Sequence, residues 1–72
     1  MVTVVFKLSD IGTVSLSIEE PVPFSRVLQL CAHKTDAAIG GVIAVRNGRV
    51  LSREDLVGVD DQIDVFPAIS GG

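Results

Sequence analysis

One amphipathic segment lies among segments of strand-like sequence, and it determines how the rest of the chain can pack. Its four apolar residues recur at positions i, i+3, i+4 and i+7, and they are Phe24, Val27, Leu28 and Cys31. This spacing predicts a helix over residues 24–34 with a single apolar stripe. A single stripe is covered by one apolar face of a sheet. We therefore expect an α+β roll, in which this helix packs on a mixed sheet of four to five strands whose other face meets solvent.

A hairpin is predicted before the helix. Apolar side chains alternate over residues 2–8, turn-forming residues follow at 9–12, and the alternation resumes over residues 13–18. Pro21 and Pro23 then end the second strand, because proline cannot donate a hydrogen bond to a ladder and restrains the residue before it. We expect these two strands to pair and to contribute one apolar face to the core.

A second hairpin is predicted after the helix. The apolar run over residues 42–46 reaches the dipeptide Asn47-Gly48, which strongly favours the two-residue turn of a hairpin, and a short strand returns over residues 49–51. Further along, Leu56 and Val57 are predicted to anchor a short helical turn. The order of elements expected to this point is strand, strand, helix, strand, strand.

The last strand is predicted over residues 62–67, where Ile63 and Val65 alternate with Asp64 and Phe66. If Ile63 and Val65 face the helix, the two-residue period of a strand places Phe66 on the open face of the sheet. An exposed Phe66 would form an apolar patch, and such patches tend to mark partner sites. Its expected neighbours in that patch are Val5 and Val45. The alternative is that Phe66 fills the margin of the core.

The composition argues against several classes of function. The 72 residues have a net charge of −3 and scattered basic side chains, which argues against a nucleic-acid partner. No stretch approaches the length of a membrane span, so we expect a soluble, cytoplasmic protein with no membrane partner. Cys31 lies on the helical stripe and is expected to be a buried packing residue. His33 has no second ligand or catalytic partner at a suitable spacing, so we expect neither a metal site nor an enzyme.

The last five residues, 68–72, are predicted to be a flexible tail that follows a folded domain over residues 1–67. Gly71 and Gly72 have no Cβ, so they fit a channel too narrow for larger residues and can present a carboxylate to another protein's active site. An α-carboxyl has a pKa of about 3.5 and is a poor electrophile when ionised. It must be activated, for example by ATP as an acyl-adenylate, before a sulfur donor, thiol or amine can attack it. A frayed end is the alternative explanation.

Three short motifs occur at defined places in this strand order. They are Val45-Arg46-Asn47-Gly48 before the short strand, Asp60-Asp61-Gln62-Ile63 leading into the last strand, and Phe66-Pro67 followed by Ser70-Gly71-Gly72. With the strand order, they make the chain resemble the ubiquitin-like β-grasp proteins, and more narrowly the ThiS and MoaD type of sulfur carrier. The resemblance covers essentially the whole chain, and the terminal Gly-Gly is its most specific part.

The resemblance implies that a ThiF- or MoeB-type adenylating enzyme uses ATP to activate the Gly72 carboxylate, and that sulfur transfer leaves a thiocarboxylate there. The sulfur would then pass to a synthase, either the large subunit of molybdopterin synthase or thiazole synthase. In this scheme Gly72 carries the chemistry and Ser70 and Gly71 thread into active sites. The residues expected to dock on the partner are Val5, Val45, Phe66, Pro67 and Ile69. The chain would be a protein cosubstrate that binds no cofactor of its own.

The residues leave several alternatives open. Phe66-Pro67 resembles the MoaD type, the small subunit of molybdopterin synthase, whereas the short connection between Leu51 and Gln62 is more similar to ThiS. A carrier for another metabolite is a third alternative, and a ubiquitin-like modifier joined to lysines through Gly72 is a fourth. In a different class, the domain would be an interaction module that binds through its open face and does not use the tail.

Overall fold

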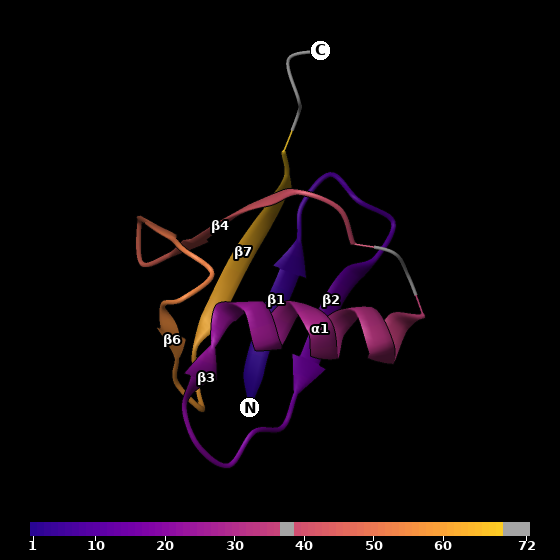
Figure 1. The fold of residues 1–72 in the computed structure, drawn as a ribbon. Coiled ribbons are helices and arrows are strands. Elements are labelled where there is room, and N and C mark those ends of the chain that lie inside the picture. The colour runs from indigo at the N-terminus through magenta and orange to yellow at the C-terminus, as the bar shows by residue number, and fades with distance from the viewer. Residues whose placement is uncertain (37–38, 69–72) are drawn as a thin grey trace.

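The strand-forming patterns of the sequence meet in one mixed sheet, within residues 1–36 and 39–68, which are the residues that the computed structural model describes. The sheet has the order β2-β1-β7-β4-β5 and contains β1 (Val2–Phe6), β2 (Gly12–Leu16), β4 (Val42–Arg46), β5 (Arg49–Leu51) and β7 (Gln62–Pro67). The helix α1 (Phe24–Thr35) crosses one face of this sheet (Figure 1). The predicted α+β class, with one helix on a mixed sheet, is confirmed for the described residues.

The first hairpin is shorter than the sequence pattern predicts. β1 pairs antiparallel with β2, but it ends at Phe6, and residues 7–11 form the turn. Leu8 is 88% exposed and has a φ of 57°, so it leaves the face that Val2 and Val4 share. The prediction that the strand continues to residue 8 is therefore wrong. The alternation of apolar residues extends beyond the point at which the backbone turns.

The helix follows its predicted stripe. All four of the predicted stripe residues, Phe24, Val27, Leu28 and Cys31, are buried. The side chain of Pro23, at the N-cap, provides no capping hydrogen bond, and Asp36 ends the helix in the left-handed conformation with its N–H donating to the carbonyl of Ala32. The start of α1 therefore needs hydrogen-bond acceptors from elsewhere in the chain, since the first N–H groups of a helix have no partner within it.

Those acceptors come from a segment for which the sequence predicts a different structure. The N–H of Phe24 donates to the carbonyl of Asp55 at 2.9 Å, and the N–H of Ser25 donates to the carbonyl of Arg53 at 3.0 Å. Next to these contacts, β3 (Val22–Pro23) pairs antiparallel with β6 (Leu56–Val57) in a second, two-stranded sheet. The predicted helical turn at residues 56 and 57 is therefore wrong, because this segment is extended and pairs with the chain that enters α1.

The second hairpin has the predicted turn. Asn47 and Gly48 have φ angles of 53° and 78°, and positive φ at both central residues is the signature of a type I′ turn. The turn places Arg46 opposite Arg49 and Val45 opposite Val50. This register determines which side chains of β5 lie beside those of β4.

Replacing Gly48 by alanine is expected to destabilise the fold by about 1–2 kcal/mol, because a Cβ is unfavourable in the left-handed region. The φ of 78° has this effect even though no atom lies within 4 Å of the added Cβ. Gly40→Ala is the matched control, since Gly40 also has open space around it but no positive φ. Urea unfolding of the two variants measures the difference. Equal losses would show that the turn geometry is not the cause.

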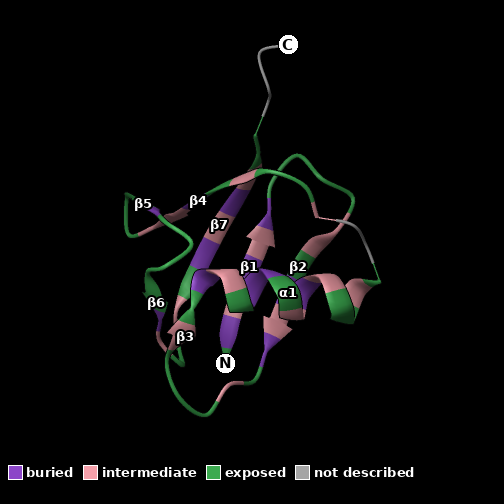
Figure 2. Cartoon of the chain, in the orientation of Figure 1, coloured by how far each residue is buried: buried purple, intermediate pink, exposed green. Residues whose placement is uncertain are grey.

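The core lies between α1 and one face of the large sheet (Figure 2). The buried residues on the sheet side are Val2, Val4, Phe6, Val14, Leu16, Ala44, Leu51, Ile63 and Val65. Ile63 and Val65 therefore face the helix, as the last strand predicts. Among the described residues, no helix has the length and apolar character that crossing a membrane requires.

Candidate docking surface at the tail root

The tail root, which we define as Pro67 and Ala68, lies at the end of β7, the central strand of the sheet. β7 lies parallel to β1 on one side and antiparallel to β4 on the other. Beyond Pro67, the N–H of Ala68 donates to the carbonyl of Gly41 at 3.0 Å, so hydrogen bonding between these two segments continues to residue 68. The predicted chemical and threading residues Gly72, Gly71 and Ser70, and the predicted docking residue Ile69, lie outside the described residues.

Two of the predicted docking residues flank β7, with Val5 on β1 at one side and Val45 on β4 at the other. Val5 pairs with Asp64 in the parallel ladder, and Val45 pairs with Asp64 in the antiparallel ladder. Val5 and Asp64 alternate with buried residues, and Val45 follows the buried Ala44, so all three lie on the sheet face that α1 does not cover. Side chains of directly opposed residues have Cβ atoms about 5 Å apart, close enough to form one surface. The structure therefore brings Val5 and Val45 together around Asp64.

Phe66 extends this surface toward the tail. It is half-buried, pairs with Ile43 on β4, and is not among the partly buried apolar residues that pack against the core. The structure thus places Phe66 on the open face, as the strand period predicts, and not in the margin of the core. We define the open-face patch as the five apolar residues Val5, Ile43, Val45, Val50 and Phe66.

Two members of the open-face patch, Ile43 and Val50, do not appear among the docking residues predicted from the sequence. Ile43 is 47% exposed and Val50 is 70% exposed. The signals for both are present in the sequence, because Ile43 lies two residues before Val45 in the same strand and the Asn47-Gly48 turn places Val50 opposite Val45. The register of the turn, applied to the open face as well as to the core, predicts both residues.

Pro67 does not join the open-face patch. It is exposed at the end of β7, opposite Val42, and the strand period directs it to the side opposite Phe66. There it lines a small hollow of about 130 Å³ with residues that include Phe6 and Ile39. Cofactor sites usually measure about 300–1,000 Å³, so this hollow has room for an apolar side chain at most. A docking role for Pro67 stays a prediction.

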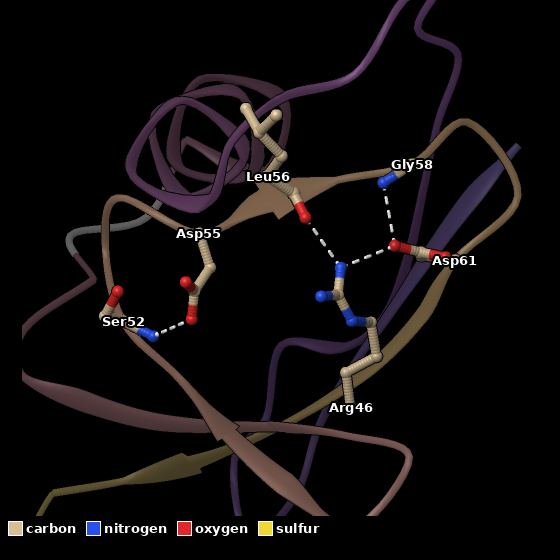
Figure 3. Close-up of polar contacts among 6 residues, drawn as sticks. All are labelled: Arg46, Ser52, Asp55, Leu56, Gly58 and Asp61. Carbon is tan, nitrogen blue, oxygen red and sulfur yellow. Dashed lines mark hydrogen bonds and ion pairs between the residues drawn. The ribbon is translucent and has the colours of Figure 1, made fainter.

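Arg46, the last residue of β4, makes two polar contacts next to the open-face patch. The guanidinium of Arg46 donates to the carbonyl of Leu56 and to a carboxylate oxygen of Asp61, both at 2.7 Å (Figure 3). The same oxygen of Asp61 accepts the N–H of Gly58 at 2.7 Å. Because Arg46 follows Val45 directly, these bonds tie the strand that carries two of the five patch residues to β6 and to the connection between β6 and β7.

Cys31 is buried in the core, as its place on the helical stripe predicts. The side chain is fully buried, and burial raises the pKa of its thiol to about 11. At neutral pH this thiol is therefore protonated, whereas the thiolate is the reactive form. His33 is exposed on α1, two positions further along. Within the part of the chain that the structure describes, no three His, Cys, Asp or Glu side chains are grouped as a metal site would require.

Comparison with known proteins does not assign this chain to a family. The sequence matches no model of a known protein family, and no curated protein matches it. The resemblance to sulfur carriers therefore rests on the motifs and the strand order of this chain, and the open-face patch is defined by its register and burial.

Proposed function

We propose that this chain is a ubiquitin-like β-grasp sulfur carrier of the ThiS and MoaD type. A ThiF- or MoeB-type enzyme adenylates its Gly72 carboxylate, and the resulting thiocarboxylate donates sulfur in the biosynthesis of molybdopterin or thiamin thiazole. The observation that carries the proposal is the position of the tail root. Phe66 lies on the open-face patch, and two residues later Ala68, bonded to Gly41, leads into residues 69–72.

The geometry supports separate roles for the two parts of the chain, in which the domain docks on the partner and the tail delivers the carboxylate. The open-face patch is a surface on which a partner can recognise the folded domain, since contiguous exposed apolar residues mark interaction sites. From Ala68, four further residues reach at most about 14 Å when fully extended. A partner that holds the patch therefore has its active site within that distance of the tail root. Neither glycine at the end adds a side chain that would block a narrow channel.

The chemistry needs two substitution steps. In the first, a carboxylate oxygen of Gly72 attacks the α-phosphorus of ATP, pyrophosphate leaves, and an acyl-adenylate forms. In the second, hydrosulfide attacks the carbonyl carbon, and AMP leaves with the carboxyl oxygen that joined it to the protein. The thiocarboxylate and one proton remain. This chain supplies only the carboxylate and its positioning, while the partner enzyme supplies the site for ATP.

The intact mass of the protein tests the proposal. After incubation with ATP, sulfide and the adenylating enzyme encoded in the same genome, we expect a mass change that corresponds to replacement of one oxygen by sulfur. Fragmentation should locate it on the peptide that ends at Gly72. An unchanged mass, with an enzyme shown to adenylate another carrier, would contradict the proposal. Products joined to lysine side chains would instead identify a protein modifier.

A further inference from the structure

One carboxylate, that of Asp64, lies among the apolar residues of the open-face patch, where the patch borders Gln62 and Thr3. Asp64 is flanked by Val5 on β1 and Val45 on β4, and Phe66 follows it on the same face of β7. Its side chain is half-buried, and it has no hydrogen-bond or ion-pair partner within residues 1–36 and 39–68. By contrast, Asp55 accepts the N–H of Ser52.

The other acidic residues near β7 also have partners. Asp60 pairs with the N-terminal ammonium at 3.0 Å, and Asp61 pairs with Arg46 at 2.7 Å. Asp64 is therefore distinguished from them by both its place and its lack of a partner in the described residues. Aspartate is also depleted in strands, so strand propensity does not explain an aspartate at position 64.

Covering the open-face patch would remove water from this carboxylate. An ion that is taken out of water without a compensating charge is strongly unfavourable, so an entirely apolar partner surface would be rejected. We propose that the partner that docks on the open-face patch places an arginine side chain against Asp64, beside apolar contacts to the rest of the patch. The inference rests on the proposed function, since the partner is the adenylating enzyme.

Arginine fits this position better than lysine does. Its planar guanidinium makes two parallel hydrogen bonds with a carboxylate, and it is more weakly hydrated than an ammonium group. Its flat faces also pack against apolar side chains such as those of Val5 and Val45. Charged pairs at the centre of an interface select the partner and its register, which is the task of a carrier that must deliver its tail to one active site.

A second copy of this chain is a poorer occupant of the same surface. In a two-fold symmetric dimer each patch would cover the other, and residues near the axis would meet their own equivalents. The two Asp64 carboxylates would then approach each other inside an apolar interface, where like charges repel. The charge of Asp64 within the patch thus disfavours self-pairing and favours a cationic partner.

The test is the dependence of adenylation on carrier concentration, measured as pyrophosphate release by the purified adenylating enzyme with ATP. For Asp64→Asn we expect KM for the carrier to rise about tenfold or more, because the partner's arginine is left buried without its counter-charge. We expect kcat to be unchanged, since this contact is made equally before and during the chemical step. The Asp64→Arg variant of the carrier should bind poorly to the wild-type enzyme. Binding should be restored when the facing arginine of the enzyme is replaced by an acidic residue.

Glu20→Gln is the matched control, because it removes the same charge from an exposed residue outside the open-face patch. Its KM should stay within about twofold of the wild-type value, since surface charges contribute little to specific docking. Equal KM values for Asp64→Asn and Glu20→Gln would overturn the inference and leave the proposed function standing. If Asp64→Asn alone dimerises in sedimentation while its KM is unchanged, the carboxylate serves only to prevent self-pairing. Failure of the wild-type protein to be adenylated would overturn the proposed function, and the inference with it.

Discussion

Adding one alanine after Gly72 is expected to lower the rate of thiocarboxylate formation at least a hundredfold. The extra residue moves the carboxylate by about 3.5 Å relative to the tail root. Misplacement of a reacting group by about 1 Å already costs about a hundredfold in rate. The domain is unaffected, because the added residue lies five positions beyond Ala68, whose N–H makes the last described contact, with the carbonyl of Gly41. Time courses of the intact mass, with ATP, sulfide and the adenylating enzyme, measure the effect.

A second variant separates the carrier from a simple interaction module. Phe66→Asp places a charge on the open-face patch and should weaken docking in both cases, since Phe66 lies beside Ile43 on that face. The extended tail should be harmful to a carrier but not to an interaction module. An extended protein that still forms the thiocarboxylate, with a mass showing that the alanine has not been trimmed, would contradict the proposed role of Gly72.

The parts of this fold that could be predicted from the sequence depend on local geometry. The helical stripe of α1 and the Asn47-Gly48 turn each involve residues close together in the chain, and their backbone preferences act within a few positions. The faces of β7 follow from a two-residue period, which places Phe66 opposite to Val65. These features gave the correct side for the predicted docking residues Val5, Val45 and Phe66.

The parts that could not be predicted depend on contacts between distant segments. The pairing of β3 with β6 joins Val22 to Val57, and neither two-residue strand has a pattern long enough to reveal it. The acceptors for the first N–H groups of α1 come from Arg53 and Asp55, about thirty residues away. For the same reason Asp64 could not be separated from its acidic neighbours, since its isolation depends on which strands flank β7 and on where Arg46 points.

Replacing Ile63 by alanine is expected to remove most of the protein's free energy of unfolding. Ile63 has no exposed surface, lies on the central strand β7, and pairs with Val4 on β1. Truncating a buried isoleucine to alanine costs about 2–5 kcal/mol, from lost burial and from the cavity left behind. A domain of this size has a net stability of only about 3–5 kcal/mol. Urea unfolding followed by circular dichroism should show a midpoint at or close to zero denaturant.

Val50→Ala is the matched control, because Val50 is 70% exposed and lies in the same sheet. Its free energy of unfolding should change by no more than about 0.5 kcal/mol, as for most surface substitutions. Ile63→Val, which removes a single methylene group, should cost about 0.5–1.5 kcal/mol and retain the fold. A loss below about 1 kcal/mol for Ile63→Ala would contradict the packing of β7 against α1. The open-face patch and the tail root are both positioned by that packing, so the docking surface would then need a different explanation as well.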